Sequence, residues 1–371
     1  MEEICIAALG DPRDPKVWSR TPSRIVDYFE SQDGYHINRL NLKDISGVLF
    51  RASSLVGKLV YRRGTLRDPL IYRIEANRIA KKTYEIKADT FLFIAEHGLN
   101  YKRRPNAKYY VYLDSLLRPH LDYDKRKQKP FFNIFLKGYE SNDRKSFEQM
   151  DAIFTQNQWS KDFINKEYGI PEERIHNVGF GINCDFYEGE KDYTKQQLMT
   201  VLRRGTEYVK GLPLLIETFK YAREEMPELK LAVFGTTAEQ VEGITYYEDC
   251  PREVMLDMYK SSSLYVMPNI LEPNGITYVE AMANKTPIVG LDRFSVPEFT
   301  GDGKYGFISP SESVKDFAGT IIGALQNPQR LVEMGRQGQA FVRNRYNWDS
   351  VLKKMERLMT NENERQERML R

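Results

Sequence analysis

The chain has 371 residues, which is enough for two domains of typical size, each with its own hydrophobic core. Hydrophobic residues make up 41% and charged residues 29%, the balance of an ordinary soluble globular protein. The 55 Lys and Arg residues exceed the 52 Asp and Glu residues only slightly, so the charge balance does not indicate a nucleic-acid-binding protein.

Cysteine usage and hydropathy bear on the compartment. The three cysteines, Cys5, Cys184 and Cys250, are widely spaced and form no metal-ligand pattern, which suits a reducing environment. The apolar run over residues 4–9 is too short for the core of a signal peptide, and no apolar stretch is long enough to span a bilayer. We therefore expect a cytoplasmic protein.

Basic residues outnumber acidic residues between positions 51 and 108. One interpretation is a solvated face, and the other is attraction to anionic lipid headgroups or to a phosphorylated acceptor, with peripheral contact at the inner face of a membrane. The basic residues concerned are Lys58, Arg62, Arg63, Arg67, Arg73, Arg78, Lys81, Lys82, Lys87, Lys102, Arg103 and Arg104.

The amino-terminal half begins with a predicted strand over residues 3–9, which runs into a loop of turn residues that starts at Gly10. A helix, a second strand over residues 35–40 and helical periodicity over residues 51–60 and 70–82 follow. The alternation of these elements indicates an α/β domain.

Two further apolar runs in this half end in polar residues. Residues 90–95 precede His97, and residues 109–113 precede Asp114. Because a doubly wound parallel sheet places its ligands at the carboxyl ends of its strands, both side chains are candidate site residues. Strands over 152–156 and 175–178 complete the half, and the polar, acidic stretch that follows is typical of a hinge.

The carboxy-terminal half again alternates strand and helix, which predicts parallel strands joined by right-handed crossovers. Strands are expected over residues 197–202, 230–234 and 264–267, and helices over residues 214–224, 254–260, 314–325, 331–345 and 348–359. Between them, residues 264–290 read as a buried strand, a loop and a helix that begins after Gly275. The N–H groups and dipole at such a helix start attract phosphate, and a glycine lets the ligand approach the backbone.

Glu272 and Glu280 stand eight positions apart on either side of this helix start, within EPNGITYVEAMANKTPIV. The stretch resembles the E-x7-E signature of retaining glycosyltransferases of the GT-B fold, most closely those of family 4. The resemblance implies an α/β chain of two Rossmann-like, doubly wound parallel-sheet domains that face each other across a cleft. It is strongest over residues 198–359, moderate over 151–183 and faint before that.

The resemblance also implies a division of labour along the chain. Residues 1–183 would bind the acceptor, residues 184–347 would bind the nucleotide sugar, and residues 348–371 would form a helix that crosses back to the first domain, followed by a charged tail. In the second domain, Glu280 would accept hydrogen bonds from the ribose hydroxyls and Glu272 would lie beside the donor sugar. The diphosphate would meet the backbone of Asn274, Gly275, Ile276 and Thr277.

Two basic residues after the strand at 197–202 complete the implied donor site. When the bond to the anomeric carbon breaks, negative charge develops on the β-phosphate, and a fixed Arg and Lys stabilise that charge most in the transition state. Lys210, which precedes Gly211, matches the family's Lys. Arg204 is the first choice for the Arg, and Arg203 is the reserve because this loop is one residue longer than usual.

Candidates near the acceptor and at the rim of the donor site are also carried over from the family. Gly10 would lie near the diphosphate, residues 18–21 would face the acceptor, and Gly235 would lie on the base or ribose side. Asp114 matches the acid of a His-Asp pair whose His is replaced here by Leu113. His97, one strand away, is the nearest substitute.

The resemblance implies a hexosyltransferase that moves a sugar, with retention and without a metal or cofactor, from a nucleotide-diphosphate sugar. A glycan, lipid-linked or other surface-polysaccharide acceptor is expected. A sugar-nucleotide epimerase, a glycogen- or sucrose-type synthase and a catalytically silent nucleotide-sugar-binding subunit remain as alternatives. A dehydrogenase is disfavoured because the first loop lacks Gly-x-Gly-x-x-Gly.

Overall fold

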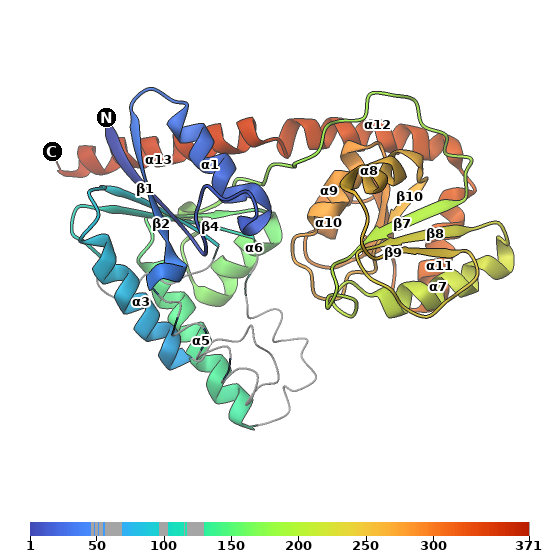
Figure 1. Ribbon diagram of the computed structural model, residues 1–371, viewed down its shortest axis with the longest axis horizontal. Helices are drawn as coiled ribbons and strands as arrows, with labels where there is room; N and C mark the ends of the chain where they lie inside the picture. Colours follow the sequence, from blue (N-terminus) through green and yellow to red (C-terminus); the bar gives the residue numbers. More distant parts are fainter. Residues whose placement is uncertain are drawn as a thin grey trace. The chain divides into compact units, whose positions relative to one another are not determined.

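The computed structural model describes residues 1–45, 48, 51, 55, 69–95, 103–114, 116 and 130–370. The chain forms two compact units: Met1–Gly179 together with Val351–Arg371, and Phe180–Ser350. Each unit is built on a sheet of six parallel strands with helices on both faces (Figure 1).

The first unit has the strand order β2-β1-β3-β4-β5-β6, so the order reverses between β1 and β3. Its strands are β1 (Glu2–Ala8), β2 (Tyr35–Asn41), β3 (Thr90–Ile94), β4 (Lys108–Leu113), β5 (Ala152–Thr155) and β6 (Ile175–Asn177). Its helices are α1 (Thr21–Glu30), α3 (Pro69–Thr83), α5 (Pro130–Glu148), α6 (Gln158–Phe163) and, from Val351 onward, α13 (Trp348–Leu370).

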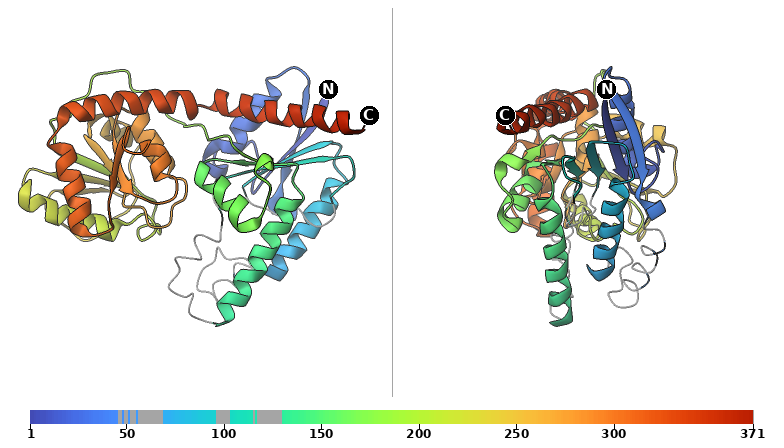
Figure 2. Two further views of the ribbon diagram at one scale, coloured as in Figure 1. Left: turned by 180° about the vertical axis from the view of Figure 1, so that it is seen from behind. Right: turned by 90° about the vertical axis from the view of Figure 1, so that its left-hand side faces the viewer.

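Helices cover both faces of this sheet, so its central strands are buried over most of their length. Phe91 and Phe93 of β3 lie in one buried cluster with Ile79 of α3. Helices α3 and α5 contact each other and run side by side (Figures 1 and 2). On α13, Glu356 accepts a hydrogen bond from Tyr28 Oη at 2.6 Å. This carboxy-terminal segment therefore packs on the unit that contains the amino terminus.

The second unit has the strand order β12-β11-β10-β7-β8-β9, which reverses between β7 and β10. Its strands are β7 (Gln197–Val201), β8 (Lys230–Phe234), β9 (Ile244–Tyr247), β10 (Leu264–Val266), β11 (Ile288–Leu291) and β12 (Gly306–Ser309). Its helices are α7 (Leu212–Glu225), α8 (Arg252–Ser261), α9 (Ile276–Ala283), α10 (Val296–Thr300), α11 (Val314–Leu325) and α12 (Pro328–Arg345).

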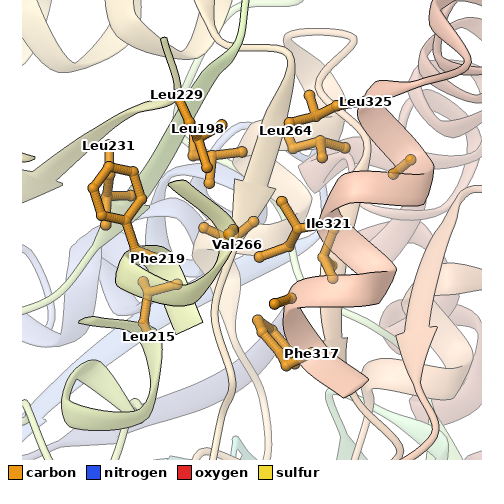
Figure 3. Close-up of a cluster of buried hydrophobic side chains, with 14 of the residues drawn as sticks. Leu198, Leu215, Phe219, Leu229, Leu231, Leu264, Val266, Phe317, Ile321 and Leu325 are labelled. Atoms are coloured by element: carbon orange, nitrogen blue, oxygen red, sulfur yellow. The ribbon is translucent and has the colours of Figure 1, made fainter. Parts of the chain in front are cut away.

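The alternation of side chains along each strand divides the core of this unit between two faces. Leu264 and Val266 point to the face covered by α7 and α11, where they lie near Phe317 and Ile321 (Figure 3). Tyr265, between them, belongs to the cluster on the α9 face. The short strand β10 is therefore buried on both sides, which fixes the start of the loop that follows it.

The predicted alternation of parallel strands and helices is confirmed, and the two sheets have the predicted doubly wound arrangement. The sequence reading missed β9, β12 and α5. It also described residues 361–371 as a charged tail, whereas α13 continues to Leu370 because Glu, Arg, Gln, Met and Leu favour helix. The helical prediction for residues 51–60 falls almost wholly outside the described residues.

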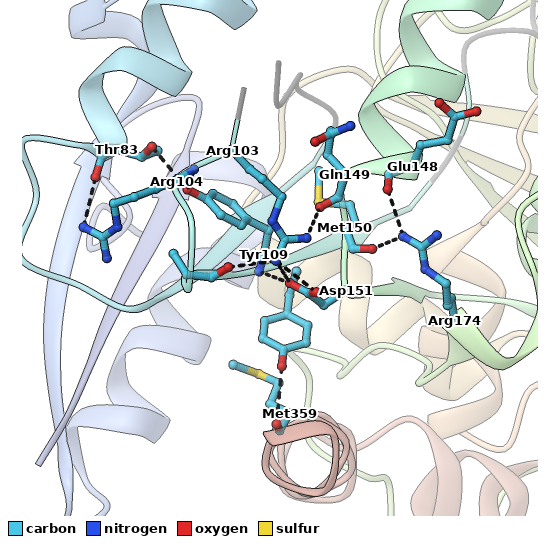
Figure 4. Close-up of polar contacts among 12 residues, drawn as sticks. Thr83, Arg103, Arg104, Tyr109, Glu148, Gln149, Met150, Asp151, Arg174 and Met359 are labelled. Atoms are coloured by element: carbon cyan, nitrogen blue, oxygen red, sulfur yellow. Dashed lines mark hydrogen bonds and ion pairs between the residues drawn. The ribbon is translucent and has the colours of Figure 1, made fainter. Parts of the chain in front are cut away.

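Arg103 and Arg104, which belong to the basic stretch described above, form hydrogen bonds with other residues of the protein (Figure 4). Arg103 Nη2 donates to Asp151 Oδ2 at 2.9 Å and to the carbonyl oxygen of Ala107 at 2.8 Å. Arg104 donates to the carbonyl oxygens of Ile86 and Ala88. Arg103 therefore links the segments that precede β4 and β5, and Arg104 bonds to the segment that precedes β3, so that part of the prediction is corrected. Lys58, Arg62, Arg63, Arg67 and Lys102 lie outside the described residues.

We expect Arg103→Met to lower the free energy of unfolding of the first unit by about 2 kcal/mol, because it leaves Asp151 buried without its cation. The side chain of Asp151 is 9% exposed and that of Arg103 is 32% exposed, so the loss lies below that of a fully buried pair. Urea unfolding followed by circular dichroism measures it. Lys82→Met removes an exposed cation paired with Glu85 and is the control, and an equal effect of both would contradict the prediction.

Candidate functional site

The loops after β7 and β10 meet at the point where the strand order of the second unit reverses. In open α/β sheets, ligands bind outside the carboxyl ends of the strands at such a point. Here the backbone joins the two loops: the carbonyl oxygen of Val209 accepts from the N–H groups of Ile270 and Leu271, both at 3.0 Å. The loop that carries Lys210 is therefore fixed to the loop that carries Glu272.

Gly211 makes this approach possible. It begins α7 with a φ of 74°, in the left-handed region, and a Cβ at this position would overlap the carbonyl oxygen of Pro268. The close contact brings Lys210 Nζ to 3.6 Å from Glu272 Oε2. The Lys210 side chain is only 12% exposed, so its charge is well placed to act on a bound anion.

The loop between β10 and α9 is shaped by its own side chains. Asn269 Nδ2 donates to the carbonyl oxygen of Glu272 at 2.5 Å, and Asn269 Oδ1 accepts from the Glu272 N–H at 2.7 Å. Ser295 Oγ contacts the carbonyl oxygens of Pro273 and Asn274 at 2.6 and 2.9 Å. The loop is therefore held before any ligand arrives.

Helix α9 begins at Ile276, after Gly275 with a φ of 74°. No side chain among the described residues caps this end, so its first N–H groups are not occupied by a capping side chain. Tyr265 Oη donates to Thr277 Oγ1 at 2.7 Å and Tyr278 Oη to the Met267 carbonyl oxygen at 2.5 Å, which fix the first turn against β10. An uncapped, fixed helix start next to a lysine is suited to bind phosphate.

Glu280 lies one turn further along α9 and is only 8% exposed. Arg252 Nη2, at the start of α8, donates to Glu280 Oε1 at 3.2 Å. Burial raises the pKa of the Glu280 carboxyl above its usual value, while the charges of Arg252 and Lys210 act in the opposite direction. The second unit therefore places a lysine, a helix start and a buried carboxyl together, a set that can hold a phosphate group and a neighbouring hydroxyl.

Arg203, Arg204 and Gly235 lie toward the β8 and β9 side of this edge. Arg204 forms an ion pair with Glu248, which follows β9, and its side chain is 74% exposed. A Cβ at Gly235, whose φ is 83°, would overlap the Leu202 carbonyl oxygen. The described contacts of Arg204 thus do not join it to the group formed by Lys210, Glu272 and Glu280.

In the first unit, Gly10 and Asp114 follow the carboxyl ends of β1 and β4. Gly10 has a φ of 131° and packs against Val17. Trp18 Nε1 donates to Asp114 Oδ2 at 3.2 Å, and Trp18, Ser19 and Arg20 have φ values of 41°, 54° and 68°. Three successive non-glycine residues in the left-handed region are strained, and such strain is common at functional sites. His97 lies outside the described residues.

The sequence reading missed several residues that shape the carboxyl edge of the second sheet: Asn269, Ser295, Arg252 and Glu207. Glu207 accepts from Thr236 Oγ1 at 2.6 Å and from the Gly205 N–H at 3.0 Å, and the Thr236 hydrogen bond is the main cause that lowers the pKa of its carboxyl. Only Asn269 carried a local signal, as an Asn at the end of a strand.

The described ranges contain neither a metal-binding cluster nor a membrane-spanning helix. No group of three His, Cys, Asp or Glu side chains there is arranged to bind a metal ion. Likewise, no helix within those ranges combines the length and the apolar character needed to cross a bilayer.

Comparison with known proteins finds a family model that matches most of the second unit. Residues 187–341 match the model described as "Glycosyl transferases group 1". Mannosylfructose-phosphate synthase of Agrobacterium fabrum is 22% identical over 243 residues, which are 56% of this chain and 52% of that protein. The chain thus spans about half the length of this curated relative.

Solved structures extend the likeness to the whole fold. Sucrose-phosphate synthase from Thermosynechococcus elongatus, at 14% identity, aligns with a TM-score of 0.67 over 97% of this chain and 99% of its own. A TarM mutant of S. aureus, solved in complex with fondaparinux, alpha-GlcNAc-glycerol and UDP, gives 15% identity and a TM-score of 0.58 over 76% and 58% of the chains. The predicted GT-B fold is thereby confirmed.

We expect Gly211→Ala to cost about 3 kcal/mol of unfolding free energy, from a left-handed alanine and from displacement of the Pro268 carbonyl. Gly205→Ala is the matched control, because Gly205 also has a positive φ, 87°, but a Cβ there has no neighbour within 4 Å. That variant should lose only about 1 kcal/mol. Urea unfolding of the two purified variants compares them, and equal losses would show that the contact with Pro268 is unimportant.

Proposed function

We propose that this chain, whose residues 187–341 match the group 1 glycosyltransferase model, is a glycosyltransferase that takes a sugar from a nucleotide-diphosphate sugar. The observation that carries the proposal is the fixed contact between the loops after β7 and β10, which sets Lys210, Glu272 and the start of α9 at one edge of the sheet. UDP in the TarM structure supports a nucleoside diphosphate as ligand.

In this proposal the uncapped start of α9, at Asn274 to Thr277, binds the diphosphate, and Glu280 accepts hydrogen bonds from the ribose. As the bond from the anomeric carbon to the phosphate oxygen breaks, its electron pair remains on the phosphate. Lys210 stabilises that charge. Glu272, 3.6 Å from Lys210, orients the lysine and lies beside the donor sugar.

We further propose that the enzyme belongs to family 4, retains anomeric configuration and works without a metal ion. The front-face substitution typical of that family needs charge neutralisation at the leaving phosphate, which Lys210 and the α9 dipole can supply, with Arg204 or Arg203 as a second cation. Proton NMR of the product distinguishes the α from the β linkage, and magnesium added to a chelator-treated enzyme tests the metal requirement.

The donor experiment is calorimetric titration of the purified protein with UDP, GDP, ADP, CDP and TDP, with and without magnesium. One nucleotide should bind clearly in both conditions. Lys210→Ala and Glu280→Gln should each lower binding or turnover by at least about 100-fold, since each removes a charge that acts at close range. Lys220→Ala, on the exposed side of α7, is the control and should leave both unchanged.

Failure of every nucleotide to bind the wild-type protein would contradict the proposed function. Release of a free, epimerised nucleotide sugar without an acceptor would instead identify an epimerase. Wild-type binding without turnover on any acceptor would identify a silent subunit.

For the acceptor we propose a glycan or a lipid-linked sugar, bound by the first unit near Trp18 and Asp114 and, if His97 reaches this edge, by His97 as well. Mannose, inositol-phosphate and ribitol-phosphate compounds appear in the names of the curated relatives. These names support a polar acceptor that belongs to cell-surface polysaccharide or lipid synthesis.

We also propose peripheral contact with anionic membranes through the basic residues of the 51–108 stretch, of which Arg78 and Lys81 are exposed on α3. The protein should sediment with vesicles that contain phosphatidylglycerol and dissociate as salt is raised, because exposed charges are screened. Equal binding to neutral phosphatidylcholine vesicles, or none to either, would contradict this contact.

A further inference from the structure

Arg252 occupies a place that local helix chemistry does not favour. It is the first residue of α8, directly after Pro251, where the positive end of the helix dipole repels a cation. An arginine at this position therefore needs a reason from elsewhere in the fold.

The reason lies in two acceptors that the guanidinium contacts. Arg252 Nη2 donates to Glu280 Oε1 at 3.2 Å and to the carbonyl oxygen of Asn183 at 3.1 Å. Asn183 is itself fixed, because its Oδ1 accepts from Trp348 Nε1 at 3.1 Å. Arg252 is thus anchored at one acceptor while it pairs with a buried carboxylate at the other.

The surroundings of Glu280 make this pairing important. Its side chain is 10% exposed, whereas that of Arg252 is 48% exposed. Arg252 and Lys210 are the cations that act on Glu280. Cys184, Tyr259 and Tyr265 also interact with it, but burial raises the pKa of each of these groups and keeps them neutral. A buried carboxylate whose cation is removed becomes protonated or changes its orientation.

We propose that Arg252 is a positioning residue of the donor site. It holds the Glu280 carboxylate in the orientation that accepts hydrogen bonds from the ribose hydroxyls. This inference rests on the proposed function, because Glu280 is the ribose ligand in that scheme. Arg252 does not touch the reacting atoms, and its effect on the donor passes through Glu280. The chemical class of ligand is a ribonucleoside diphosphate.

The sign of the pH effect follows from the two influences on the carboxyl. Burial raises the pKa of Glu280 and Arg252 opposes the rise, so Arg252→Met should raise that pKa further. The ionised carboxylate accepts hydrogen bonds from the two hydroxyls more strongly than the protonated carboxyl, in which one oxygen carries a proton. Donor affinity should therefore fall most at low pH in this variant and recover as pH rises through the carboxyl pKa.

The test is calorimetric titration with whichever of UDP, GDP, ADP, CDP and TDP binds the wild-type protein, between about pH 5 and about pH 8. Arg252→Met should lower affinity at least about tenfold at the acidic end and by less than about threefold at the other. Arg252→Lys should restore the wild-type profile in large part. Lys260→Met, which removes an exposed cation from the same helix, should change nothing.

A double-variant cycle separates positioning from direct contact with phosphate. In the Glu280→Gln background, which has no buried charge and so protects folding, Arg252→Met should have little further effect on affinity. An equal loss in both backgrounds, or the same loss at every pH, would overturn the inference and assign Arg252 to the phosphate. The inference would also be overturned if Arg252→Met bound the nucleotide as tightly as the wild type. If the wild-type protein bound no nucleotide, the proposed function itself would be contradicted.

Discussion

The carboxyl edge of the second sheet depends on the close approach of two backbone segments, Val209–Gly211 after β7 and Pro268–Leu271 after β10. A glycine at position 211 lets the chain turn in the left-handed region against the Pro268 carbonyl, and two N–H groups then bond to Val209. Because β7 and β10 are neighbours on either side of the point where the strand order reverses, the loops diverge to opposite faces beyond this contact. The backbone contact at Val209 and Gly211 is what brings Lys210 and Glu272 close to each other.

Rigidity beneath this edge comes from the core. The short strand β10 is covered on one face by α7 and α11 and on the other by α9, so its end cannot shift without displacing buried side chains. Tyr265 and Tyr278 add polar contacts from that core to the first turn of α9 and to Met267. The helix start is therefore oriented before a ligand binds, which reduces the entropy lost on binding.

Charge is distributed unevenly over the two units. In the second unit the buried carboxyl of Glu280 forms an ion pair with Arg252 and is also influenced by the charge of Lys210. Arg204 is exposed and pairs with Glu248. In the first unit two arginines of the basic stretch stabilise the fold, because Arg103 and Arg104 donate to backbone carbonyls that precede β4 and β3. A count of basic residues along the chain thus overstates the charge free for a partner, because burial and backbone contacts cannot be read from composition.

Patterns along the chain were enough to predict the alternation of strands and helices, both parallel sheets in outline and the grouping of Glu272, Gly275 and Glu280 around one helix start. These are local properties, since apolar runs, turn residues and helical spacing report on neighbours along the chain. The contacts of Lys210 with Glu272, of Arg204 with Glu248 and of Arg252 with Glu280 appear only in the folded protein, and nothing in the sequence around Arg252 marked it as the partner of Glu280. Such contacts join residues far apart in the chain, and strand order and the packing of loops, not spacing, set which of them form.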